Sequence, residues 1–210
     1  MNSRTTPPGP PAAVAGRSEA PLLNIANALT VVRLVLVPVF IWLMFRPGDA
    51  VRLVAALVFA LAAATDRLDG QLARSRNLVT SFGKIADPIA DKALTLSAFV
   101  LLSVAGRLWW WVTVLIIVRE LGITLMRFVM LRRAVMAASR GGKLKTALQV
   151  TGIFGLLVPW AAFVPPVLAT ALDLAAYALV GSALVVTLVT GADYVLEALR
   201  LSRADPGGRP

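Results

Sequence analysis

The chain has 210 residues, 58% of them hydrophobic, and a mean hydropathy of +0.79. This apolar share exceeds the roughly 45–50% of a soluble domain and indicates a membrane protein. Because the sequence has no Cys and no His, thiolate sites and histidine bases are excluded, and metal or acid–base chemistry must depend on carboxylates. We interpret the net charge of +10 as helix ends facing anionic lipid headgroups, and expect no nucleic-acid partner.

Apolar segments of about 20 residues predict an all-α, polytopic membrane protein with six transmembrane helices. Residues 1–21 are rich in Pro, Gly, Ala and Ser, and we expect a disordered cytoplasmic tail there. A second cytoplasmic tail is expected over 201–210, and one domain over 22–200. The first span follows a short interfacial, partly polar segment at Leu22 and ends before Pro47.

Polar residues at the start of this span have two interpretations each. Asn27 and Thr30 either contact a nucleotide or cap the helix. Arg33 lies further in, and it either extends to the lipid headgroups or faces an internal anion.

The second span starts near Val51 and continues directly into an acidic stretch, and the third runs from about Phe82 to Val104. Four aspartates in this region require a shared explanation, because a carboxylate in or beside a membrane is costly. They form two pairs, each about one helical turn apart: Asp66 with Asp69 and Asp87 with Asp91. Two such helices meeting at the cytoplasmic face would form an all-oxygen cage for two hard divalent cations, Mg²⁺ or Mn²⁺.

Other residues of the acidic stretch support a phosphate-binding role. Arg74 supplies a planar cation that matches phosphate oxygens, and the small residues Gly70, Ala73 and Gly83 allow close approach. The alternative is that the aspartates are helix caps and interfacial charges paired with nearby Arg and Lys. Capping explains neither the glycines nor the two acidic pairs.

The fourth span follows Trp109, an aromatic residue typical of the membrane interface, and carries Arg119, Glu120 and Arg127 within an apolar run. Arg119 is costly there unless it pairs or binds a ligand, and pairing with Glu120 is not expected because adjacent helical residues point apart. A basic loop with paired glycines that break the helix is predicted next, over 132–146. The fifth and sixth spans are expected over 146–164 and 169–198.

The distribution of basic residues predicts the orientation. With six spans, most Lys and Arg residues lie on one side, which the positive-inside rule assigns to the cytoplasm. We therefore expect a multi-pass protein of the cell membrane whose acidic stretch and both termini face the cytoplasm.

The acidic stretch matches the pattern D-x-x-D-G-x-x-A-R, eight residues, G-x-x-x-D-x-x-x-D without a departure. This pattern resembles that of the CDP-alcohol phosphotransferase family. The resemblance implies six transmembrane helices, a homodimer, and displacement of CMP from a CDP-linked lipid by an alcohol at a cytoplasmic site. It also implies roles for individual residues: metal ligation by Asp66, Asp69 and Asp87, ligation or general-base action by Asp91, and room for cytidine at Gly70 and Ala73.

Segments outside this pattern are similar to the phosphatidylglycerophosphate synthases of that family: NIANALTVVRLVLVPVF, DPIADK, IIVRELGITLMR and GKLKTALQ. This likeness implies CDP-diacylglycerol as donor and sn-glycerol 3-phosphate as acceptor. The acceptor's phosphate requires fixed cations, for which the candidates are Arg119, Arg127, Lys143 and Lys145. For the two lysines, contact with lipid headgroups is the alternative.

Other functions stay open at this stage. The same chemistry could use phosphatidylglycerol, giving cardiolipin, or inositol phosphate as acceptor. An ion transporter lined by the aspartates is an alternative of another class, although the acids cluster at one membrane face only. A non-catalytic scaffold would not need intact metal ligands.

Overall fold

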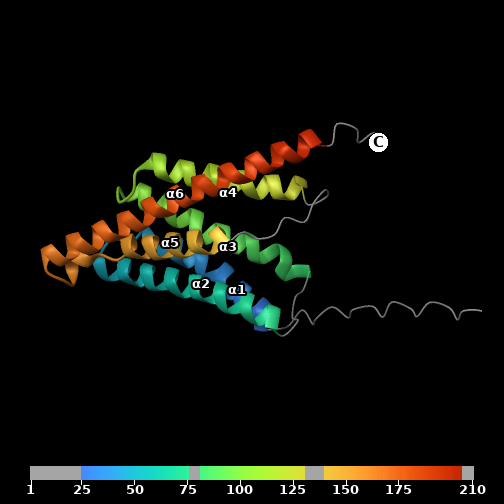
Figure 1. Cartoon of the computed structure of the whole chain (residues 1–210). Helices are drawn as coiled ribbons and strands as arrows, with labels where there is room; N and C mark the ends of the chain where they lie inside the picture. Colours follow the sequence, from blue (N-terminus) through green and yellow to red (C-terminus); the bar gives the residue numbers. More distant parts are fainter. Residues whose placement is uncertain (1–24, 76–80, 131–139, 205–210) are drawn as a thin grey trace, which may run out of the picture.

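The structure is a computed structural model that describes residues 25–75, 81–130 and 140–204. For residues 26, 66–75, 81–85, 87, 88, 126–130, 140–143 and 193–204 it describes the backbone alone. These parts of the chain contain α-helices, one short 3₁₀ turn and no strand (Figure 1). The elements are α1 (Ile25–Met44), α2 (Asp49–Ser75), α3 (Ser81–Val104), α4 (Trp110–Met130), α5 (Arg140–Leu157), the turn Trp160–Ala162 and α6 (Pro166–Ala204).

Three short connections meet at one end of this helical bundle, which we call the turn end (Figure 1). They join α1 to α2, α3 to α4 and α5 to α6. Arg52, near the start of α2, donates from Nε to the carbonyl oxygen of Leu157 at the end of α5, over 3.2 Å. Tyr177 of α6 donates its hydroxyl hydrogen to the carbonyl oxygen of Arg107, over 2.7 Å. These bonds hold the three connections together.

The opposite end, which we call the aspartate end, contains the start of α1, the end of α2, the start of α3 and the end of α6. Both terminal helices therefore have their outer ends on the same side of the bundle. The predicted tail over 1–21 and most of that over 201–210 lie outside the described residues, so the expectation that both termini face the cytoplasm is not tested.

The core lies where α1, α2, α3 and α5 pack together, and α4 and α6 contribute further buried residues to it. Phe40 of α1 and Phe59 of α2 are fully buried, and their ring centroids are 5.7 Å apart. Phe99 of α3 and Ile153 of α5 are also fully buried. Aromatic pairs at this separation add to the free energy gained from burial alone.

Helices α5 and α6 pack closely because α5 presents two glycines to α6. A Cβ on Gly155 would lie 2.7 Å from Cβ of Ala176, and one on Gly152 would lie 2.8 Å from Cγ2 of Val180. Small residues let helix backbones approach each other in this way. No larger side chain fits at these two positions without displacing α6.

Several predicted boundaries were wrong in the second half of the chain. Helix α5 begins at Arg140, so Gly141 and Gly142 lie in its first turn and do not break a helix. It ends at Leu157, before Pro159, and not at 164. Pro166 is the first residue of α6, a position that suits proline because the first helical N–H groups have no intrahelical acceptor.

Only part of the membrane prediction is confirmed. Among the described residues, two helical segments are long and apolar enough to cross a membrane, Asn27–Met44 and Pro166–Ala192, and Leu144–Leu157 is a shorter apolar helix. Helices α2 and α3 carry the charges of the acidic stretch, and α4 carries the charges of the fourth span. Six transmembrane helices therefore stay a prediction, whereas the all-helical fold is confirmed.

Candidate functional site

The backbone brings the two pairs of aspartates to the same end of the bundle. Helix α2 runs without a break to Ser75, so it includes Asp66 and Asp69, as the sequence predicts. Helix α3 includes Asp87 and Asp91 and packs against α2. The end of α2 and the start of α3 both belong to the aspartate end. The two acidic pairs thus come from two packed helices at one end.

The side chains of Asp66, Asp69 and Asp87 lie outside those that the structure describes, and Asp91 is half-buried. The described side chains alone include no group of three carboxylates that could hold a metal ion. With three of the four aspartates outside that set, the predicted metal site is not tested. The donor set itself fits a hard divalent cation, since carboxylate oxygens are the ligands that Mg²⁺ and Mn²⁺ prefer.

A buried carboxylate next to this region joins three cations from three helices. Glu120 of α4 is only 3% exposed. Its Oε1 accepts hydrogen bonds from Nη1 of Arg119, at 3.1 Å, and from Nζ of Lys145 on α5. Its Oε2 accepts a hydrogen bond from Nζ of Lys92 on α3. We call these four residues the Glu120 cluster.

Arg119 is also attached to α6. Its Nε donates to the carbonyl oxygen of Thr187 over 2.9 Å, and its Nη2 donates to Oγ1 of Thr190 over 2.7 Å. The expectation that Arg119 would not pair with Glu120 was therefore wrong. The Arg119 side chain is long, and its bonds to α6 direct Nη1 back toward Glu120. The direction of the Cα–Cβ bonds alone does not predict this contact.

The Glu120 cluster has three cations and one carboxylate, so positive charge is in excess by two. Burying such an excess is costly unless an anion is bound there. Lys92 directly follows Asp91 on α3, so the two residues share one turn of the helix although their side chains point in different directions. A phosphate group that carries two negative charges would match this excess.

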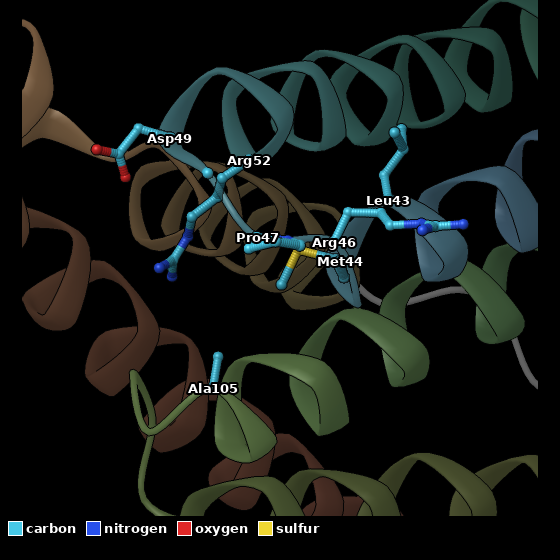
Figure 2. Close-up of a pocket in the computed structure, with 8 residues that line it drawn as sticks. Leu43, Met44, Arg46, Pro47, Asp49, Arg52 and Ala105 are labelled. Carbon is cyan, nitrogen blue, oxygen red and sulfur yellow. The ribbon is translucent and has the colours of Figure 1, made fainter.

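A cavity of about 210 Å³ lies elsewhere, at the turn end (Figure 2). Its lining includes Arg46, Asp49 and Arg52, and Figure 2 shows the Arg52 side chain extending from α2 toward the side where Ala105 lies. At 1.5 Å per helical residue, Asp49 and Asp66 are separated by about 25 Å along α2. The cavity is therefore remote from the aspartates.

Comparisons with known proteins agree with this arrangement of residues. The profile of the CDP-alcohol phosphatidyltransferase family matches residues 23–192. The chain belongs to this family. It is accordingly an enzyme, a transferase of phospholipid biosynthesis.

Individual relatives of this phosphatidyltransferase are similar over most of their length. A protein of Mycobacterium tuberculosis named "Probable phosphatidylglycerophosphate synthase" is 50% identical over 190 residues, which cover 89% of this chain and 86% of the relative. A Bacillus subtilis protein named "CDP-diacylglycerol--glycerol-3-phosphate 3-phosphatidyltransferase" is 35% identical over 150 residues, covering 65% and 78%. A Rickettsia typhi protein of the same name is 39% identical over 136 residues, covering 64% and 76%.

The phosphatidyltransferase buries all three polar residues at the start of α1. Asn27 and Thr30 follow Ile25, the first residue of α1, and so lie within the helix, which does not favour the capping interpretation. Arg33 is 0% exposed. A side chain that extends over a lipid-facing surface would be exposed, so Arg33 belongs to the interior.

Of the residues predicted to bind the acceptor's phosphate, the structure brings together Arg119 and Lys145, through Glu120. The remaining predicted residues of the phosphatidyltransferase site are described by their backbone alone. Arg127 lies in α4 and Lys143 in α5. The predicted nucleotide-binding residues of α2 are Gly70, Ala73 and Arg74.

Sequence reasoning did not predict the contact between Glu120 and Lys92. Glu120 was considered only as a possible partner of Arg119, and Lys92 only as one of the Arg and Lys residues near the aspartates. Both are charged residues within or beside long apolar helices, and the cost of burying such charges is the signal that could have singled them out.

Proposed function

We propose that this enzyme transfers a phosphatidyl group from CDP-diacylglycerol to sn-glycerol 3-phosphate, giving phosphatidylglycerophosphate and CMP. The observation that carries the proposal is the Glu120 cluster, which has two excess positive charges, is largely buried except at Lys92, and includes the residue that follows Asp91 on α3. An acceptor with a phosphate monoester fits this charge, whereas an acceptor without one leaves it uncompensated. The names of the relatives from B. subtilis and R. typhi support the same substrates.

The reaction requires an alcohol oxygen to attack the phosphorus of the phosphatidyl group while the bond from that phosphorus to CMP breaks. The bonding electron pair leaves with CMP. The alcohol gives up its proton, and we assign the acceptance of that proton to the carboxylate of Asp91, because the sequence has no histidine or cysteine.

The four aspartates would hold two divalent cations, which we propose to be Mg²⁺ or Mn²⁺. When bound, such ions neutralise diphosphate charge and make CMP a better leaving group. Gly70, Ala73 and Arg74 of α2 would accommodate the nucleotide, with Asn27 and Thr30 of α1 nearby. Arg127 and Lys143 would join Arg119 and Lys145 around the acceptor's phosphate.

A direct test uses the purified full-length chain with CDP-diacylglycerol, Mg²⁺ and radiolabelled glycerol 3-phosphate. We expect label in the lipid fraction and equimolar CMP. Phosphatidylglycerol and inositol phosphate serve as competing acceptors in parallel reactions. Incorporation of either one in preference to glycerol 3-phosphate would refute the proposed acceptor.

We further propose a multi-pass location in the cell membrane, with the aspartate end in the cytoplasm. Large apolar side chains are exposed on α2, α4 and α6, among them Leu57, Val118 and Leu174. Many exposed apolar side chains on several helices suit contact with lipid. Accessibility labelling of cysteines introduced at 46 and 205 in intact cells would test the orientation, and crosslinking in the membrane would test the homodimer that the family resemblance implies.

A further inference from the structure

We infer that Lys92 binds the phosphate of the acceptor and that Glu120 is the positioning residue that holds Lys92 and Lys145 for this task. The inference rests on the proposed function, because it concerns the acceptor of that reaction. It adds two residues that the sequence patterns do not assign to the acceptor.

The first argument is how firmly each cation is already held by the described contacts. Arg119 donates from all three of its nitrogens, to Thr187, Thr190 and Glu120, so the plane of its guanidinium is fixed. Lys92 and Lys145 each use one of three N–H donors, on Glu120, and an ammonium group can rotate to turn the other two toward a ligand. The lysines are therefore better able than Arg119 to adjust to a bound phosphate.

The second argument is access. The side chain of Lys92 is 29% exposed, whereas those of Lys145, Arg119 and Glu120 are 9%, 12% and 4% exposed. Lys92 is thus the most open cation of the Glu120 cluster. A ligand that approaches from outside the cluster meets Lys92 first.

The third argument is the position of Lys92 relative to the reacting groups. Lys92 follows Asp91 on α3, and Asp91 is the proposed base. Because side chains of adjacent helical residues point in different directions, a phosphate bound by Lys92 would lie to one side of Asp91, and the hydroxyl of a short alcohol would have to extend from it toward that carboxylate. Fixing a reactant in this way lowers the entropic part of the barrier.

Glu120 has a defined part in this arrangement. Its two oxygens bind cations from different helices, Lys92 of α3 on one side and Lys145 of α5 on the other. Two ammonium groups would repel each other at this separation without the carboxylate between them. Glu120 therefore keeps them near enough to bind the same phosphate.

The test compares Lys92→Met, Lys92→Arg and Glu120→Gln with the unaltered full-length protein in mixed micelles, with CMP release measured at varied glycerol 3-phosphate. For Lys92→Met we expect at least a tenfold higher KM for glycerol 3-phosphate and an unchanged KM for CDP-diacylglycerol. Lys92→Arg should have a KM for glycerol 3-phosphate close to that of the unaltered protein, because it keeps a cation at this position. Glu120→Gln should raise the same KM, because its lysines lose their common anchor.

Arg107→Met is the matched control, since it removes a cation from the ion pair with Asp173 at the turn end. It should leave the KM for glycerol 3-phosphate unchanged. Thermal unfolding of every variant separates loss of binding from loss of folding. If Glu120→Gln does not fold, Lys92→Met and Lys92→Arg still test whether Lys92 binds the phosphate. In both variants Glu120 keeps its ion pairs with Arg119 and Lys145.

An unchanged KM for glycerol 3-phosphate in Lys92→Met overturns the inference, as does an equal rise in both KM values. If the protein instead uses another phosphate-bearing alcohol, the proposed function fails, but Lys92→Met must still raise the KM of that alcohol at least tenfold. If the accepted alcohol carries no phosphate monoester, both are overturned. Competition by inorganic phosphate gives a second readout, and it should be weaker in Lys92→Met.

Discussion

Gly191 of α6 lies directly against the side chain of Arg119. A Cβ on Gly191 would be 3.3 Å from both Cγ and Nε of that arginine. The absence of a side chain at 191 lets Arg119 reach the backbone of α6 at Thr187 and still bond to Glu120. One glycine on the sixth helix therefore helps to set the geometry of a cluster built on the third, fourth and fifth.

Gly191→Val should displace Arg119 and so disturb the Glu120 cluster. Loss of one hydrogen bond to a charged group costs about 1.5–3 kcal/mol, and we expect the resulting displacement of Arg119 to raise the KM for glycerol 3-phosphate. Steady-state CMP release measures this change. Gly181→Val on the same helix is the control, because nothing lies within 4 Å of a Cβ there. Equal behaviour of the two variants would contradict the role of Gly191.

Asp91→Asn should abolish turnover while largely preserving nucleotide binding, because it removes the proposed proton acceptor. Asp66→Asn should weaken both turnover and nucleotide binding, because it removes a proposed metal ligand. Equilibrium binding of CDP-diacylglycerol and single-turnover CMP release distinguish the two cases. If both variants lose metal binding equally, Asp91 is another ligand and not the base.

Removal of divalent cations with a chelator should stop CMP release, and adding Mg²⁺ or Mn²⁺ should restore it. The physical reason is that a diphosphate leaving group needs its charge neutralised. Ca²⁺ is an informative third ion, since its larger radius and flexible coordination suit binding better than displacement at phosphorus. Full activity in the chelated protein would remove the case for a metal site at the four aspartates.

Gly155→Leu should destabilise the fold, because the position of its Cβ is already 2.7 Å from Ala176. Overpacking of this kind costs about 1–3 kcal/mol. A lower midpoint of thermal unfolding in detergent is the expected result. Gly122→Leu on α4 is the control, since open space surrounds that position. A midpoint unchanged in Gly155→Leu would mean that α5 and α6 separate at little cost.

Thr113→Val tests the polar contacts of the turn end. Oγ1 of Thr113 lies 2.7 Å from Oγ of Ser103 and donates to the carbonyl oxygen of Phe99 over 3.3 Å, and both threonine and serine are buried. Leaving Ser103 without this partner should cost about 1–3 kcal/mol in unfolding free energy. Thr170→Val on the exposed face of α6 should cost much less, and unfolding by denaturant compares the two.

The helices that carry the aspartates were predictable because their determinants are local. The apolar run that begins near Val51 continues in helical register into Asp66, and α2 accordingly extends to Ser75. The start of α5 was missed because Gly141 and Gly142 are weak helix formers in isolation. Packing of the rest of α5 against α6 outweighs that local preference, and the sequence alone does not contain this information.

The candidate site likewise has one part that the sequence predicts and one part that depends on how the helices pack. The spacing of the four aspartates follows from helix geometry and could be recognised directly. The Glu120 cluster instead unites Lys92, Glu120 and Lys145, which are 28 and 25 residues apart and lie on three different helices. Such a grouping depends on how α3, α4 and α5 pack, so single-sequence patterns do not predict it.

The close contact at Gly152 and Gly155 has a mechanical consequence. Because α5 and α6 pack closely at these glycines, we expect Lys145 on one helix and the Thr187 carbonyl on the other to move as one unit. If α6 spans the bilayer as we propose, tilting is one way in which this long helix would respond to a thinner or thicker bilayer. Lys145 and the anchor of Arg119 would then move together, so changes in lipid composition should alter the orientation of this unit without pulling the cluster apart.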